Sequence, residues 1–97
     1  MDELISVIIK EPGKAPKRKT IKNTLRAFQQ TVNGHIEVFP IGVGVIGVVN
    51  EDGIPLALPF NCEIAGHKIY GTLIVCSTDG ENFASLPYEV ELTEGGK

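Results

Sequence analysis

Apolar and polar residues alternate along this chain in a pattern that predicts short strands around one helix. Residues 4–10, LISVIIK, are apolar and β-branched, which is typical of a first strand. The Pro-Gly step in EPGKAP predicts a turn after it. KRKTI, residues 17–21, then predicts a short strand whose positive charge suits the edge of a sheet.

The next segment, about residues 23–33, predicts the principal helix. Asn23 suits the N-cap position. Apolar residues recur at spacings of four, three and four, which places them on one helix face: Ile21, Leu25, Phe28 and Val32. Asn33-Gly34 predicts the end of the helix, with Gly34 in the left-handed position that follows a helix.

The second half of the chain predicts the remaining strands. HIEVFPI alternates between apolar and polar residues and predicts a strand that ends near Pro40. Asp52-Gly53 lies between apolar runs, so we expect a hairpin that joins strands at about 43–49 and 54–58. Residues 58–68 are predicted to be a connection. KIYGTLIVCS predicts a long apolar strand, in which Gly71 marks a bulge or a close backbone approach.

These elements predict a single α+β domain over residues 1–97, with a mostly antiparallel sheet of five to six strands and one main helix (about 23–33) packed on one face. The segments 43–49 and 69–76 are apolar on both faces of a strand, whereas one helix covers only one face. Either the sheet curls toward a barrel, or its second face is buried in an oligomer. We expect a homo-oligomer.

The stretch GVGVIG, residues 42–47, matches the G-x-G-x-x-G pattern of dinucleotide-binding loops. That chemistry requires a helix directly after the glycines, because the N-terminus of this helix binds the pyrophosphate. Here Val48, Val49 and the predicted hairpin turn follow instead. We therefore interpret the stretch as a strand. Its glycines, Gly44 and Gly47, would let the helix or a partner subunit approach closely.

The net charge of −3 conceals a strong segregation of charge along the chain. Seven of the nine basic residues lie within residues 10–26, whereas nine of the twelve acidic residues lie after residue 30. A basic cluster concentrates anionic partners near the protein, although a solvated surface has the same composition. The N-terminus lacks a basic region, and no apolar run approaches the roughly 20 residues of a membrane span. We expect a cytoplasmic protein without a membrane partner.

Candidate catalytic chemistry is sparse. Cys62 and Cys76 form no metal-ligand or disulfide framework, and His35 and His67 have no partner at metal-ligand spacing. No acid–base pair or activated nucleophile stands out. We therefore predict no metal, no cofactor, no catalytic residue and no enzyme activity.

The residues chosen for ligand binding favour an anion. The EPGK turn would expose consecutive backbone N–H groups beside a lysine, which together attract phosphate or carboxylate. Arginine and lysine would neutralise phosphate, and asparagine amides near strand ends would contact a base or ribose. The predicted ligand-binding residues are Pro12, Gly13, Lys14, Arg26, Asn50, Asn61 and Thr72.

The order of these features resembles a family of small uncharacterised proteins common in bacteriophages and mobile elements, domain of unknown function 3846. The resemblance covers nearly the whole chain and rests on VIIKEPGKAPKRKTI, FQQTVNGHIEVFPI, VVNEDG, LPFN, and IYGTLIVCS with the later FASL. The family often places an arginine after the asparagine of LPFN, where this chain has Cys62 after Asn61. The resemblance implies a phage or plasmid accessory protein with no established catalytic activity.

We therefore expect a non-catalytic accessory protein that binds a small anionic ligand, derived from a nucleotide, and sequesters a signal of host defence. One alternative is an inhibitor that binds a host enzyme. Another is a nucleic-acid-binding module that uses residues 10–26, although nucleic acid is the less favoured partner. Its affinity would fall steeply with salt.

Overall fold

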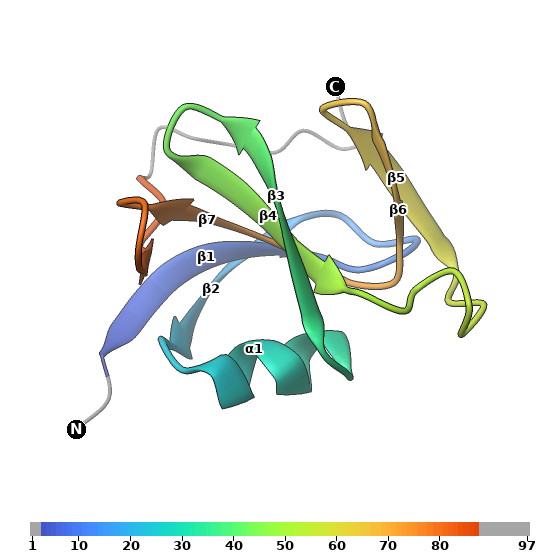
Figure 1. Cartoon of the computed structure of the whole chain (residues 1–97), viewed down its shortest axis with the longest axis horizontal. Helices are drawn as coiled ribbons and strands as arrows, with labels where there is room; N and C mark the ends of the chain where they lie inside the picture. The colour runs from blue at the N-terminus through green and yellow to red at the C-terminus, as the bar shows by residue number, and fades with distance from the viewer. Residues whose placement is uncertain (1–2, 88–97) are drawn as a thin grey trace.

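The computed structural model describes residues 3–87 and contains a six-stranded antiparallel sheet, a separate two-stranded hairpin and one helix (Figure 1). The elements are β1 (Leu4–Lys10), β2 (Lys17–Lys22), α1 (Leu25–Val32), β3 (Ile36–Gly42), β4 (Val45–Asn50), β5 (Phe60–Ile64), β6 (His67–Tyr70), β7 (Leu73–Thr78) and β8 (Phe83–Ala84). The larger sheet has the order β2-β1-β7-β4-β3, with β8 paired to β7, and β5 and β6 form the hairpin. The predicted α+β class is confirmed, but the strands divide between two sheets.

Helix α1 begins and ends at polar residues that satisfy its terminal backbone groups. The Thr24 hydroxyl accepts a hydrogen bond from the Ala27 N–H at 3.1 Å. Asn33 adopts the left-handed conformation at φ 62° after the last turn. The predicted cap positions were each wrong by one residue. The Asn23 Nδ2 instead donates to the Phe83 carbonyl at 2.9 Å.

Both faces of the larger sheet are covered by this chain itself. On one face, Phe28 and Val32 of α1 are buried among residues of β1, β4 and β7. On the other face, Cys62 and Ile69 of the hairpin and Leu86 are buried against the sheet. Strands that are apolar on both sides need cover on both sides. The sequence-based reason for an oligomer was therefore wrong, because the hairpin and the segment around Leu86 cover the second face.

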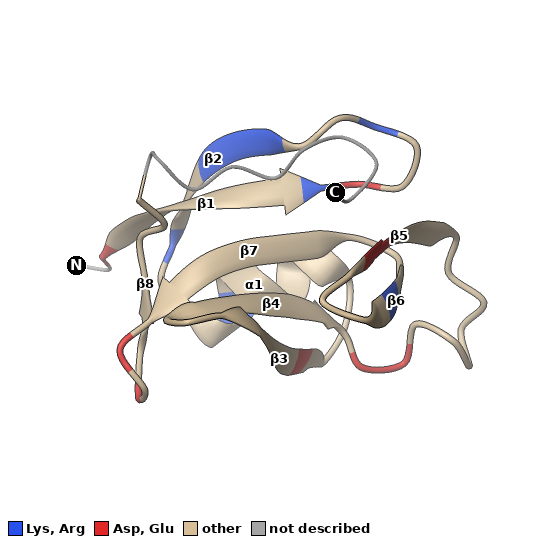
Figure 2. Ribbon diagram, turned by 90° about the horizontal axis from the view of Figure 1, so that it is seen from above, with Lys and Arg blue, Asp and Glu red and all other residues tan. Residues whose placement is uncertain are grey.

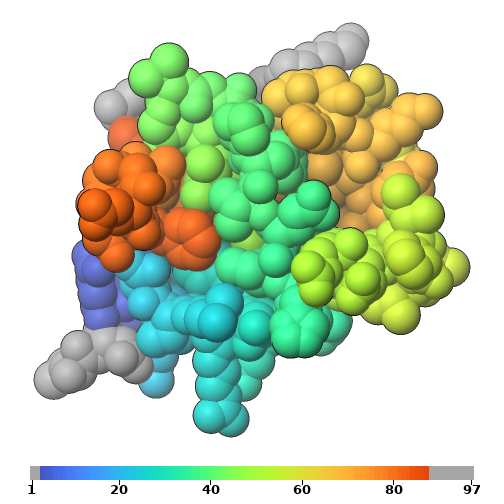
Figure 3. Space-filling model, in the orientation of Figure 1, coloured from blue at the N-terminus to red at the C-terminus, as the bar shows by residue number. Residues whose placement is uncertain are grey.

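The turn between β3 and β4 corrects the interpretation of GVGVIG. Val43 and Gly44 form this turn, where Gly44 has φ +69° and its carbonyl accepts from the Thr78 N–H at 3.0 Å. Asp52-Gly53 does not join two strands. Residues 51–57 form consecutive turns instead of the predicted strand at 54–58, since proline lacks the N–H that a central strand needs. This segment protrudes at the lower right of Figure 3.

Gly47 makes room for a neighbour within the same chain. It pairs with Phe39 across β3 and β4, and a Cβ atom at Gly47 would lie 2.5 Å from the Phe39 Cζ atom. The aromatic ring therefore lies over the glycine. The sequence correctly predicted a close approach here. The approaching group was predicted wrongly, because it is neither the helix nor a partner subunit.

The predicted connection at 58–68 and the predicted long strand after it were also wrong. Ala65 and Gly66 both have positive φ, 51° and 80°, and form the tight turn of the β5–β6 hairpin. Gly71 then ends β6 with φ +85°, and Leu58 packs where its Cβ would be, 2.8 Å from the Leu58 Cδ1 atom. The close backbone approach predicted at Gly71 is confirmed, and it separates β6 from β7.

No helix within residues 3–87 has the length and apolar composition of a membrane span.

Candidate functional site

Two depressions lie between the edge strand β2 and helix α1, and together we call them the β2–α1 groove. The first has a volume of about 410 Å³ and is lined by Lys22, Thr24, Arg26, Ala27 and Gln30. The second has a volume of about 290 Å³ and is lined by Ile9, Glu11, Lys19, Ile21, Thr31 and Thr72. The groove therefore combines the basic strand with the polar side of the helix.

Local periodicity explains why these residues meet. Thr24, Ala27 and Thr31 are spaced by three and four residues, so they share one face of α1. Their small side chains leave space beside β2. Along β2, Lys19 and Ile21 alternate with residues of the opposite face and so both face the second depression. The Thr31 hydroxyl donates to the Ala27 carbonyl at 2.8 Å, which leaves its oxygen as an acceptor.

The charges in the groove are mostly positive. Lys19, Lys22 and Arg26 line it, and none of them has a carboxylate partner within residues 3–87. Its acid, Glu11, is already in a long ion pair with Lys14, at 3.9 Å between Oε2 and Nζ. Figure 2 shows lysine and arginine along β2, on the opposite side from the acidic residues of β3 and of the loop after β4. A partly enclosed positive surface attracts anions.

The predicted anion-binding turn lies next to the groove. The Lys14 N–H donates to the Glu11 carbonyl at 3.1 Å, and Gly13 has φ +74°. Pro12 precedes that glycine, as in a type II turn. One of the N–H groups expected to bind an anion therefore already has a partner. The exposed Lys14 ammonium belongs to the same end of the sheet as the second depression, which Glu11 also lines.

Of the other predicted residues, Arg26 and Thr72 line the groove, one in each depression. Asn61, in β5, does not line the groove and instead lies beside the end of β1. Its Nδ2 donates to the Lys10 carbonyl at 2.7 Å and to the Gly71 carbonyl at 2.8 Å. These bonds hold the end of β1 against the start of β7. The Asn61 Oδ1 atom is buried and has no hydrogen-bond partner among the described residues.

Asn50 is away from the groove and has a structural environment. It is 4 % exposed, and its Nδ2 donates to the carbonyls of Val32 and Asn33 at 3.1 and 3.2 Å. Its Oδ1 accepts from the Asp52 N–H at 2.8 Å. Asn50 therefore satisfies carbonyls at the end of α1. Sequence reasoning missed Lys19 and Lys22 as individual site residues, although both belong to the basic cluster that it identified.

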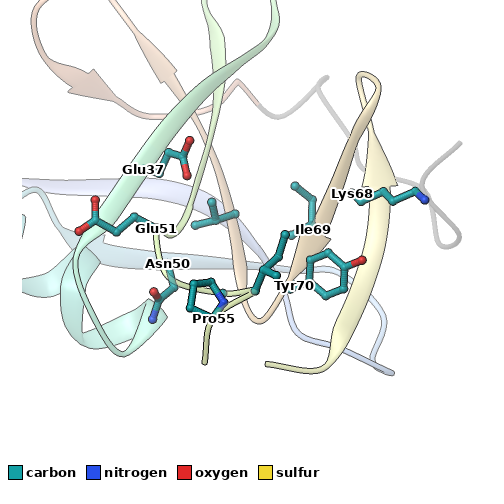
Figure 4. Close-up of a pocket in the computed structure, with 10 residues that line it drawn as sticks. Glu37, Asn50, Glu51, Pro55, Lys68, Ile69 and Tyr70 are labelled. Carbon is teal, nitrogen blue, oxygen red and sulfur yellow. The ribbon is translucent and has the colours of Figure 1, made fainter. Parts of the chain in front are cut away.

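A smaller cleft of about 180 Å³ lies between the β3–β4 pair and β6 (Figure 4). Glu37 and Glu51 come from the sheet side, and Ile69 and Tyr70 from the hairpin side. Lys68 also lines it, but in Figure 4 its side chain extends away from the two acids. This cleft is acidic and apolar, so it suits a cation better than an anion.

Both cysteines are free thiols, and both are buried. Burial raises the pKa of Cys76 to about 12. Burial also raises the pKa of Cys62, an effect that the nearby Lys10 charge opposes. Protonated thiols are poor nucleophiles and metal ligands. Within residues 3–87, no group of three histidine, cysteine or acidic residues could hold a metal ion.

The fold and the groove define an α+β domain with a basic surface groove on one side of an antiparallel sheet. The family described as Domain of unknown function (DUF3846) matches residues 5–94, so the chain belongs to this family, as its motifs predicted. Neither a curated protein nor a solved structure matches the chain.

Proposed function

We propose that this protein is a non-catalytic module that binds a small anionic, nucleotide-derived ligand in the β2–α1 groove. One observation carries the proposal: Lys19, Lys22 and Arg26 line two depressions between β2 and α1 and have no carboxylate partner among residues 3–87. Hydrogen bonds to charged groups contribute about 1.5–3 kcal/mol each, so useful affinity requires that more than one of these cations contacts the phosphate.

The rest of the groove supports a nucleotide over an inorganic anion. The depressions, about 290 and 410 Å³, are at the small end of the range for ligand pockets. Ile9 and Ile21 supply an apolar wall in the second depression, suitable for a base. Thr72 and Gln30 supply polar groups for ribose or base edges. A phosphate in the first depression and a base in the second would use both.

The biological setting is part of the proposal. A phage or mobile element would use such a module in the host cytoplasm to sequester a nucleotide signal of host defence. The setting follows from the family resemblance and not from the groove. A binding function without catalysis fits the groove residues, because Glu11, their one carboxylate, is paired with Lys14. Homo-oligomerisation stays a prediction, which sedimentation would test.

The test is calorimetry with the full chain and a panel of linear and cyclic nucleotides, with inorganic phosphate as reference. Arg26→Glu and Lys19→Glu should each lower the affinity for the tightest-binding nucleotide by about tenfold or more, since each replaces an attractive charge by a repulsive one. Lys68→Glu is the matched control, because it makes the same charge change outside the groove. Absence of binding across the panel, with no small molecule released on heating protein from its native cells, would contradict the proposal.

A nucleic-acid function has one observation in its favour, namely that the basic residues continue from the groove to Lys17 at the start of β2. Short single-stranded DNA and RNA oligonucleotides separate the two functions. A nucleic-acid site loses affinity steeply between low and physiological salt, since several counterions are released. A mononucleotide site changes far less. A steep salt dependence together with preference for the longer oligonucleotide would favour this second function.

A further inference from the structure

The most unusual surface of the molecule is the segment IPLALPF, residues 54–60, which we call the apolar loop. Its seven consecutive residues are apolar, yet Ile54 is 72 % exposed, Leu56 58 % and Phe60 54 %. The segment protrudes from the body of the molecule in Figure 3. A run of exposed apolar residues is unfavourable in water and is typical of an interaction surface.

The apolar loop is held in place by the structure beneath it. Four backbone hydrogen bonds of 2.9 to 3.2 Å close the turns around it, among them the bond from the Leu58 N–H to the Gly53 carbonyl. Leu58 is half-buried against Gly71, and Gly53 lies so close to the Tyr70 carbonyl that a Cβ would be 3.0 Å from it. The loop therefore presents its exposed side chains in a fixed arrangement. Binding to a rigid loop costs less ordering entropy.

The charges around the apolar loop indicate which class of partner it binds. Glu51 and Asp52 lie three and two residues before the first residue of the loop, and both are exposed. Glu37 and Glu51 line the acidic cleft, whose wall includes Ile54 and Pro55 of the loop. Anionic lipid surfaces attract basic segments, so this acidic rim disfavours a membrane. It favours a protein whose apolar pocket is surrounded by lysine and arginine.

We propose that the apolar loop is a docking surface for a second protein with an apolar pocket and a basic rim. The loop side chains occupy that pocket, and one lysine or arginine of the partner enters the cleft beside Glu37, whose carboxylate faces the hairpin in Figure 4, while Glu51 adds to the acidic rim. The apolar loop shares no residue with the β2–α1 groove, so this interaction is separate from anion binding. Side chains that fill a desolvated pocket near the centre of an interface carry most of the binding energy of such contacts.

The experiment places a photo-crosslinking residue on the intact chain in its native cells, as Leu56→p-benzoyl-L-phenylalanine. The matched control is Val43→p-benzoyl-L-phenylalanine, because Val43 is also apolar and fully exposed, at the β3–β4 turn. The crosslinked protein is then purified, and its binding to the full chain is measured by calorimetry. Leu56→Ser and Glu51→Lys test the apolar and acidic parts separately, and Val43→Ser is the control for both.

The proposal expects one protein crosslinked from position 56 and not from position 43. Its affinity should fall by about tenfold or more with Leu56→Ser, by severalfold with Glu51→Lys, and by less than about twofold with Val43→Ser. Circular dichroism confirms that each variant is folded. The proposal is overturned by crosslinks only to a second copy of this chain, by equal crosslinking at both positions, by no crosslink, or by unchanged affinity of Leu56→Ser. Co-sedimentation of the protein with phosphatidylcholine–phosphatidylserine vesicles would also overturn the proposal, because it would identify a membrane as the binding partner of the loop.

Discussion

The clearest stability prediction concerns Asn50, which the sequence placed in the ligand site and the structure places under the end of α1. Asn50→Ala removes two donors to the carbonyls of Val32 and Asn33 and one acceptor for the Asp52 N–H. Each intramolecular hydrogen bond contributes about 1 kcal/mol, and an unsatisfied buried group costs somewhat more. We expect the free energy of unfolding to fall by about 3 kcal/mol.

Urea denaturation measures this loss. A protein of this size has an m-value of about 1–1.5 kcal/mol/M, so the midpoint should fall by about 2–3 M with m unchanged. The variant should still fold, because small domains have about 5–15 kcal/mol of stability. Gln30→Ala is the control, because it truncates an amide that is exposed on α1. Its stability should change by less than about 0.5 kcal/mol.

Two results would refute this reasoning about Asn50. A loss below about 1 kcal/mol would mean that water replaces the three hydrogen bonds at little cost. A near-native stability combined with lost nucleotide binding would mean that Asn50 contacts the ligand, as the sequence analysis predicted. Nucleotide affinity of the folded variant should instead equal that of the unmodified chain.

Three further predictions follow from local geometry. Gly47→Val should destabilise the fold by about 1–3 kcal/mol, because its Cβ would displace the Phe39 ring; an unchanged melting temperature would contradict this. The pKa of Asp79 is lowered because the backbone N–H groups of Asn82 and Glu81 donate to its carboxylate. The stability that this gives is present above pH about 4 and is lost as the pH falls, so Asp79→Asn should make the free energy of unfolding less sensitive to acid. An NMR titration that placed the pKa of Asp79 at or above its usual value would disprove this. Burial raises the pKa of Cys76 to about 12, so iodoacetamide at pH 8 should label Cys76 only after the protein unfolds. The free energy of unfolding should fall as the pH rises above about 9, where the thiol ionises only in the unfolded chain. Rapid labelling of Cys76 in the folded chain would contradict this.

Elements with a strong local pattern were predictable from the sequence. The run LISVIIK gave β1 with its bounds, and the helical period placed Phe28 and Val32 in the core. Leu25 belongs to the same period but is 58 % exposed and is not part of the core that contains Phe28 and Val32. Periodicity therefore identifies a face, whereas tertiary packing decides how far along the helix that face is covered.

Pairing between distant segments was not predictable in the same way. Two glycine-containing steps compete as hairpin turns, Val43-Gly44 and Asp52-Gly53, and the second has the stronger local preference. The first is used because it pairs β3 with β4 over six residue pairs and brings β4 beside β7. The Ala65-Gly66 turn has no strong sequence pattern, since alanine rarely adopts positive φ. Cover for the second sheet face was missed for this reason.

The candidate groove needed the same long-range information. The sequence identified the basic segment and Arg26, but Lys19 and Lys22 become site residues only when β2 pairs with β1 and α1 lies beside it. The position of Asn50 and Asn61 near predicted strand ends also suggested that they join a common site. Their amide groups instead donate to backbone carbonyls. An asparagine amide can donate either to a carbonyl of the same chain or to a ligand, so the residue type alone does not distinguish the two.

The distribution of charge bears on the choice between a small anion and a long nucleic acid. The chain has a net charge of −3, and its axes extend 35, 27 and 22 Å. The Debye length at physiological ionic strength is about 8 Å, so a mononucleotide in the β2–α1 groove experiences mainly the nearby cations. A long strand that wrapped around to the acidic residues of β3 and of the loop after β4, on the far side in Figure 2, would have its phosphates repelled there. On the groove side, the basic residues continue as far as Lys17 at the start of β2. If both proposals hold, the same segregation would let the acidic rim of the apolar loop bind its basic partner while the groove holds an anion.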